Sequence, residues 1–195
     1  VLADAPVELS CVEYKAEELV STMYKDIVLG QYNVVYMHCD EENESRITAL
    51  AELIKKAMPT SVVIIGGIHV SFGTRRFMEA NPCVDFVVRG EPEMVLFNFI
   101  KTLVTYEFDF EGIAGLAYRE NDSVYVNPLD VPVQMEALPF PYEKAHMNST
   151  EEVYYETVRG TSDRCSYAQF LPDARVRSLS LNRICTELRY FLVKE

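Results

Sequence analysis

The stretch Ser61-Val62-Val63-Ile64-Ile65-Gly66-Gly67 decides the fold, because four consecutive β-branched residues are followed directly by two glycines. A strand that is apolar on both faces is typical of a parallel sheet with helices on each side. Two readings of the glycines stay open. They form a tight turn between strand and loop, or they let a ligand or another backbone approach closely because no side chain stands in the way.

Short β-branched runs alternate with amphipathic runs from Val7 to about Thr105. This alternation predicts an α/β fold, a doubly wound parallel sheet with flanking helices. The expected strands are Val7–Tyr14, Val34–Cys39, Val62–Ile65 and Val84–Val88. The expected helices are Ala16–Leu29, a helix from the acidic cluster Asp40–Glu44 to Pro59, a short one near Arg75–Glu79, and one from Glu93 to about Val104.

The character of the chain changes after Thr105. Ile113–Arg119 and Ser123–Asn127 predict a β-hairpin with a polar turn, and Pro128–Pro141 carries four of the nine prolines, as an extended linker would. Beyond it we expect a strand over Val153–Val158, a loop at 159–175 and a helix over about Leu181–Leu192. We therefore divide the chain into a sheet domain (1–105), a hairpin and linker (106–150) and one βα unit (151–195).

Composition narrows the classes of partner. Eighteen Lys and Arg against thirty Asp and Glu give a net charge of −12, which repels nucleic acid. The longest apolar runs, such as Met94–Val104, are far shorter than the roughly 20 residues that cross a bilayer, so we expect no membrane span. The odd number of scattered cysteines, without any Cys-x-x-Cys pair, favours a reducing cytoplasm: Cys11, Cys39, Cys83, Cys165 and Cys185.

In a doubly wound sheet, ligands bind in the loops after the carboxyl ends of the strands. Here those loops are His38–Glu42, Gly66–Phe72 and Arg89–Glu93. His69 lies at the same edge and is either a packing residue or a cofactor contact. Asp40 also suggests a phosphoryl-accepting domain, but Arg89 stands where such a domain has lysine, which weakens that hypothesis.

The tail carries the most specific motif. The run from Tyr154 through Arg159-Gly160 to Ala168 closely resembles the opening of the radical S-adenosylmethionine (SAM) enzymes. There a strand ending in Arg-Gly precedes three cysteines that hold a [4Fe–4S] cluster. Positions 161, 165 and 168 correspond to them, and only Cys165 is a cysteine. Thr161 and Ala168 cannot replace thiolates, so we expect no cluster and no cleavage of SAM here.

Further motifs resemble the cobalamin-binding half of the cobalamin-dependent radical SAM proteins, which include anaerobic magnesium-protoporphyrin monomethyl ester cyclases and related methyltransferases. In order they are Ala51–Lys56, Val62–Gly67, Val84–Glu91, Gly115–Arg119 and Leu138–Tyr142. The resemblance implies a Rossmann-like, flavodoxin-type sheet with cobalamin over the carboxyl ends of its strands. It assigns contacts with the cofactor to His38, Cys39, Gly66, Gly67, Arg89, Gly90 and Glu91; His69 joins them by position.

The leading hypothesis is an N-terminal fragment of such an enzyme, of methyltransferase or oxidative cyclase type, that binds a corrinoid but holds no cluster. The alternative is a non-catalytic interaction or scaffold domain that has lost both cofactors. We also expect an unpaired strand edge between the first two predicted strands, and an exposed edge favours pairing with another chain as a homo-oligomer.

Overall fold

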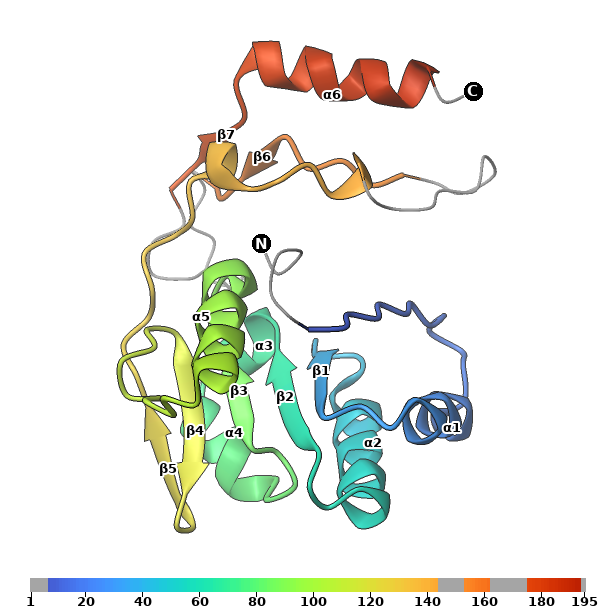
Figure 1. Ribbon diagram of the computed structural model, residues 1–195, viewed down its shortest axis with the longest axis vertical. Coiled ribbons are helices and arrows are strands. Elements are labelled where there is room, and N and C mark those ends of the chain that lie inside the picture. The colour runs from blue at the N-terminus through green and yellow to red at the C-terminus, as the bar shows by residue number, and fades with distance from the viewer. Residues whose placement is uncertain (1–6, 144–152, 162–174, 194–195) are drawn as a thin grey trace. The chain divides into compact units, whose positions relative to one another are not determined.

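The computed structural model describes residues 7–143, 153–161 and 175–193. The chain forms two compact units, one reaching to Val131 and the other beginning at Pro132. Figure 1 shows the elements of each unit.

The first unit is built on a five-stranded sheet in the order β1-β2-β3-β4-β5. The strands β1 (Val34–His38), β2 (Val62–Gly66) and β3 (Phe86–Val88) are parallel. The strands β4 (Leu116–Glu120) and β5 (Ser123–Val126) continue the sheet as an antiparallel hairpin. The predicted α/β class with a largely parallel sheet is confirmed, and the predicted hairpin extends that sheet.

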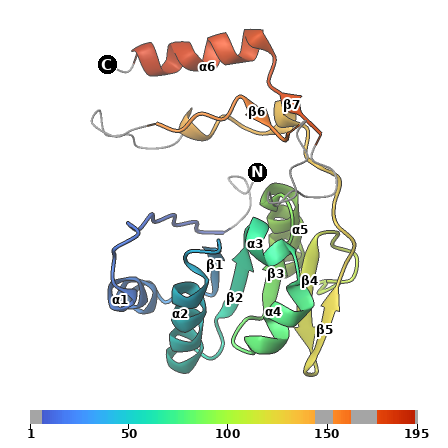
Figure 2. The ribbon, with the colours of Figure 1, turned by 180° about the vertical axis from the view of Figure 1, so that it is seen from behind.

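Helices cover both faces of the sheet because its central strands are apolar on both sides. Their bounds are α1 Val20–Gly30, α2 Glu44–Ala57, α3 Ile68–Ser71, α4 Thr74–Ala80 and α5 Pro92–Thr105. One core joins Val63 and Ile65 to Met23 of α1, Leu50 of α2 and Met78 of α4. The other core lies under α5, which is in front of the sheet in Figure 1, whereas α4 is in front in Figure 2.

The predicted strand Val7–Tyr14 is wrong: the described residues form three parallel strands, not four. Residues 8–15 run without regular secondary structure, and Leu9 and Val12 are exposed. Alternation of apolar and polar residues suits a strand, but a strand also needs a neighbour for its backbone hydrogen bonds. No described residue supplies one here. The short helix α3 was also not predicted.

The second unit joins the proline-rich linker to the C-terminal helix. It contains the 3₁₀ turns η1 (Met135–Ala137) and η2 (Pro141–Glu143), the two-residue strands β6 (Val158–Arg159) and β7 (Arg177–Ser178), and α6 (Leu181–Val193). Of the predicted strand Val153–Val158, only its last residue is in a ladder. The predicted C-terminal helix is confirmed.

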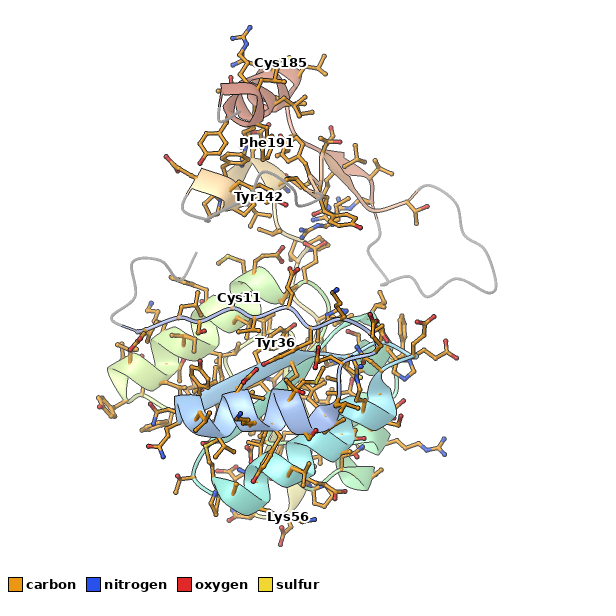
Figure 3. The ribbon with its side chains drawn as sticks, turned by 90° about the vertical axis from the view of Figure 1, so that its right-hand side faces the viewer. Cys11, Tyr36, Lys56, Tyr142, Cys185 and Phe191 are labelled. Atoms are coloured by element: carbon orange, nitrogen blue, oxygen red, sulfur yellow. The ribbon has the colours of Figure 1, made fainter. Side chains whose placement is uncertain are left out.

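One arginine ties α6 to the linker. The Arg183 guanidinium donates to the carbonyl oxygens of Glu136, at 2.8 Å, and Leu138, at 2.7 Å, and pairs with Glu187 at 2.7 Å. Rings from both segments pack together, among them Tyr142 and Phe191, which Figure 3 labels. The second unit is therefore held by polar and aromatic contacts between segments far apart in the sequence.

Within the described residues, no helix has the length and apolar character that a membrane-spanning helix needs.

One ion pair connects α2 to the beginnings of the strands β2 and β3. Asp85 Oδ2 accepts from Lys55 Nζ at 2.9 Å and from the backbone N–H of Val63 at 2.8 Å. We expect Asp85→Ala to lower the free energy of unfolding by about 2 kcal/mol, because a charged acceptor with two donors is lost. The control Lys56→Ala, which removes an exposed pair with Glu52, should change it by less than about 0.5 kcal/mol. Urea denaturation measures both, and equal effects would contradict this assignment.

Candidate cofactor-binding site

The carboxyl ends of the three parallel strands lie in one row. His38 pairs with Gly66, and Gly66 pairs with Val88. The ladder continues one step further, because the N–H of Cys39 donates to the carbonyl of Gly66 at 2.7 Å. The three predicted ligand loops therefore begin side by side at one edge, which we call the rim: residues 38–42, 66–72 and 89–93.

Glycine is required at the centre of the rim. Gly67 has a φ of +133°, and a Cβ there would stand 2.1 Å from the carbonyl oxygen of Cys39. That oxygen belongs to the backbone and cannot move aside, so no other residue fits. A Cβ on Gly66 would meet the Tyr36 hydroxyl at 2.4 Å. The backbone of Gly67 is partly exposed, whereas Gly66 is buried beside the Tyr36 ring.

The hydroxyl of Ser71 connects two of the three loops. Ser71 Oγ donates to the carbonyl of Gly67 at 2.8 Å and accepts from the N–H of Gly90 at 2.9 Å. The Ser71 residue is only 5% exposed, so water does not compete freely for these bonds. The sequence analysis missed Ser71; its place four residues after Gly67, within a helical turn, is the signal that could have found it.

The first loop of the rim is closed by its own side chains. Asp40 Oδ1 accepts from the N–H groups of Glu42 at 3.0 Å and Asn43 at 2.8 Å, while Asn43 Oδ1 accepts from the N–H of Asp40 at 3.0 Å. These reciprocal bonds close the turn of residues 40–43, directly before α2 begins at Glu44. Asp40 therefore has a structural task, and this weakens the hypothesis of a phosphoryl acceptor.

A histidine links the second loop to the start of α2. His69 Nε2 lies 2.7 Å from Glu44 Oε2 at the start of α2. The other ring nitrogen, Nδ1, is buried and has no hydrogen-bond partner among the described residues. Glu44 thus holds His69 by Nε2, and the buried Nδ1 is unpaired among the described residues.

The two candidates at the end of β1, His38 and the following Cys39, differ in exposure. His38 is exposed, and its ring lies near the position that a Cβ of Gly67 would take. Cys39 is fully buried, and burial raises the pKa of its thiol to about 11, helped by the carboxylates of Glu44 and Asp40. A neutral, buried thiol is a poor metal ligand, so Cys39 contributes its backbone to the rim. Burial likewise raises the pKa of the neighbouring Tyr36 to about 12.

The third loop is anchored to the hairpin. The N–H of Arg89 donates to the carbonyl of Gly115 at 2.8 Å, and its guanidinium donates to the carbonyl of Asn127 at 2.6 Å. Desolvation lowers the pKa of Arg89, yet a guanidinium stays charged at neutral pH. Gly90, with a φ of +80°, follows, and Glu91 lies directly before α5 with Pro92 in its first turn.

The structure therefore brings all eight candidates to the rim. Cys39 and Gly66 are buried there, and the other six are at least partly exposed. Across the described segments, no three His, Cys, Asp or Glu side chains converge as a metal site. Cys165, the predicted cluster ligand, lies outside the described residues, as does Ala168. The rim presents backbone groups and polar side chains.

A comparison with protein families decides the relationship. The sequence model of the B12 binding domain matches residues 1–99, just over half of the chain. The chain belongs to the B12 binding domain family. The resemblance inferred from the motifs is confirmed.

Curated relatives agree with this assignment. The chain is 33% identical over 93 residues to an uncharacterized methyltransferase of Pyrococcus horikoshii, covering 47% of this chain and 20% of the relative. It is 24% identical over 172 residues to the cobalamin-dependent radical SAM methyltransferase TokK of Streptomyces tokunonensis. The match covers 82% of this chain and 25% of TokK. It is 37% identical over 81 residues to the anaerobic magnesium-protoporphyrin IX monomethyl ester cyclase of Cereibacter sphaeroides. The match covers 37% of this chain and 13% of the cyclase. The chain thus spans a quarter or less of these relatives.

Solved structures share the fold. The cobalamin-dependent SAM radical enzyme OxsB superposes with a TM-score of 0.70 at 19% identity, over 89% of this chain and 25% of OxsB. The radical SAM methyltransferase TsrM from Kitasatospora setae, solved with cobalamin and a [4Fe-4S] cluster bound, superposes with a TM-score of 0.61 at 16% identity. The superposition covers 89% of this chain and 38% of TsrM. At these identities the likeness establishes the fold of the B12 binding domain and the segment after it.

The Ser71 hydroxyl gives a direct test of how the rim is held. We expect Ser71→Ala to cost about 2 kcal/mol of unfolding free energy, because the Gly90 N–H loses its acceptor in a part-buried place. The matched control is Ser45→Ala on the exposed side of α2, which should cost less than about 0.5 kcal/mol. Urea midpoints measure both changes. A Ser71→Ala protein as stable as the control would show that the hydroxyl does not hold the loops.

Proposed function

We propose that this chain binds a corrinoid across the rim and serves as the cofactor-carrying part of a cobalamin-dependent radical SAM enzyme of methyltransferase or cyclase type. The observation that carries the proposal is the Gly67 rim within a B12 binding domain: partly exposed backbone at a position where no side chain fits. OxsB, solved with aqua-cobalamin bound, shares this fold.

Each rim residue has a defined part in this proposal. The peptide backbones at Gly67 and Gly90 allow the ring to approach closely, and Ser71 fixes them relative to each other. His38 and His69 offer imidazole nitrogens to the polar amides at the edge of a corrin. Arg89 and Glu91 flank the third loop, while Cys39 and Gly66 support the rim from below.

The residues fit a corrinoid better than a bare metal ion. His69 Nδ1 is a buried nitrogen without a partner, which is the kind of group that a bound polar ligand satisfies. A bound corrinoid supplies the metal-centred chemistry, and the protein supplies binding and orientation. Substrate selection and the reaction belong to the remainder of the enzyme. This chain spans a quarter or less of the length of the curated relatives that it matches.

Binding of hydroxocobalamin tests the proposal. We expect the protein to co-elute with hydroxocobalamin on gel filtration and to shift its visible spectrum. His69→Ala should weaken binding by about fivefold, the effect of one hydrogen bond. The control Lys56→Ala changes a residue that is well exposed on α2, away from the rim, and should bind as the wild type does.

A second measurement separates the proposal from the alternative of a scaffold without cofactors. A ligand that binds only the folded state must raise the melting temperature. A melting temperature unchanged by saturating hydroxocobalamin, with no co-elution, would favour the scaffold and contradict corrinoid binding.

The cluster motif gives an independent prediction. Anaerobic iron–sulfur reconstitution of the wild-type chain should leave it without a stoichiometric cluster, since positions 161 and 168 lack thiolates. The double variant Thr161→Cys/Ala168→Cys supplies three thiolates and should bind more iron and sulfide under the same conditions. A stoichiometric cluster in the wild type, measured by iron and sulfide content, would overturn this part of the proposal.

A further inference from the structure

Three arginines line one cavity beside the rim. Arg75 and Arg76 belong to α4, and Arg89 begins the third loop of the rim. The cavity has a volume of about 400 Å³, and the rest of its lining is Gly73, Thr74, Glu79 and Val126. Figure 2 shows α4 next to β5, the strand that ends at Val126. All lining residues lie between positions 73 and 126, within the first unit.

Backbone carbonyls hold two of the guanidinium groups in place. Arg75 Nη1 donates to the carbonyl of Val124 in β5, and Arg89 Nη1 donates to the carbonyl of Asn127 at 2.6 Å. A guanidinium has five N–H donors, so each keeps donors that these bonds do not use. The Nε of Arg89 is buried and has no hydrogen-bond partner among the described residues. A buried donor without a partner is costly, and a bound acceptor removes that cost.

The charge of the three arginines is not neutralised by ion pairs. None of them pairs with a carboxylate of the described residues. Acidic residues outnumber basic ones in this chain, thirty to eighteen, so the cluster does not reflect an excess of basic residues. Desolvation lowers the pKa of Arg89, and an anion nearby would offset this cost to the charged form.

The balance of charge at the cavity indicates which anion fits. Glu79 is the acidic residue of the lining, so three guanidinium groups and one carboxylate leave two positive charges. A phosphate monoester carries about −1.5 to −2 at neutral pH, whereas a diester carries a single negative charge. The planar guanidinium fork also matches the spacing of phosphate oxygens. A dianionic phosphate is therefore favoured over a singly charged group.

We propose that this cavity binds the phosphate group of a phosphate monoester, a small molecule distinct from the corrinoid. Arg75 and Arg89 supply guanidinium groups that are already held in place, and the exposed Arg76 supplies the third. A volume of about 400 Å³ exceeds that of a phosphate group, so part of the esterified molecule also has room. The inference does not rest on corrinoid binding, because every lining residue except Arg89 lies outside the three rim loops.

Titration calorimetry with methyl phosphate tests the proposal, in a phosphate-free buffer at about pH 7.5, where this monoester is mostly a dianion. We expect saturable binding with a Kd of about 1 mM or below. Dimethyl phosphate, which carries one negative charge, should bind about tenfold more weakly. In proton–nitrogen NMR spectra, the Nε–H signal of Arg89 should shift as methyl phosphate is added, because this donor gains an acceptor.

A pair of matched variants tests the arginines. Arg76→Gln removes one guanidinium from the cavity at an exposed position of α4, and it should weaken methyl phosphate binding by about tenfold. The control Arg189→Gln makes the same change at an exposed position of α6 that does not line the cavity, and it should bind as the wild type does. Circular dichroism and the urea midpoint show that both variants fold.

Corrinoids distinguish two sources of the phosphate group, because cobalamin contains a phosphodiester that cobinamide lacks. We expect methyl phosphate to bind equally well with and without saturating hydroxocobalamin. Displacement by hydroxocobalamin but not by cobinamide would assign the cavity to the cofactor's own phosphate and overturn the proposal of a separate ligand. A protein that binds methyl phosphate but no hydroxocobalamin would support this inference and contradict the proposed function alone.

Three further results would overturn the proposal. They are absence of saturable binding of methyl phosphate, equal binding of methyl phosphate and dimethyl phosphate, and equal affinities of the Arg76→Gln and Arg189→Gln variants.

Discussion

No side chain fits at residue 67, and the arrangement of the whole rim depends on this constraint. The carbonyl of Cys39 occupies the space where a Cβ of Gly67 would stand. The end of β2 can therefore approach the end of β1 closely while its own backbone stays partly accessible. A backbone surface of this kind allows another group to approach closely, because no side chain stands in between.

The other rim contacts keep this close approach in one geometry. Ser71 joins the Gly67 loop to the Gly90 loop, and the paired Asp40 and Asn43 close the first loop onto α2. These bonds involve buried or part-buried backbone groups, which are costly to leave unpaired. Polar contacts therefore hold the rim in one arrangement above a core of aliphatic residues.

The sequence predicted those parts of the fold that burial alone determines. The run Val62–Ile65 is apolar on both faces and forms a central strand. The run Val84–Val88 is apolar apart from Asp85, and it forms a central strand that begins only at Phe86. Val7–Tyr14 has a pattern suited to a strand but lacks a neighbour, and pattern carries no information about the partner. The rim positions followed from topology, whereas Ser71 depends on a tertiary contact with Gly90 that spacing along the chain does not reveal.

The central claim is that the rim binds a corrinoid, and mapping by amide hydrogen exchange tests it most directly. With saturating hydroxocobalamin, slower exchange should be concentrated in residues 38–42, 66–71 and 89–93, while the start of β2 and the middle of α2 stay unchanged. Protection confined to another surface, or none at all at saturation, would contradict the account.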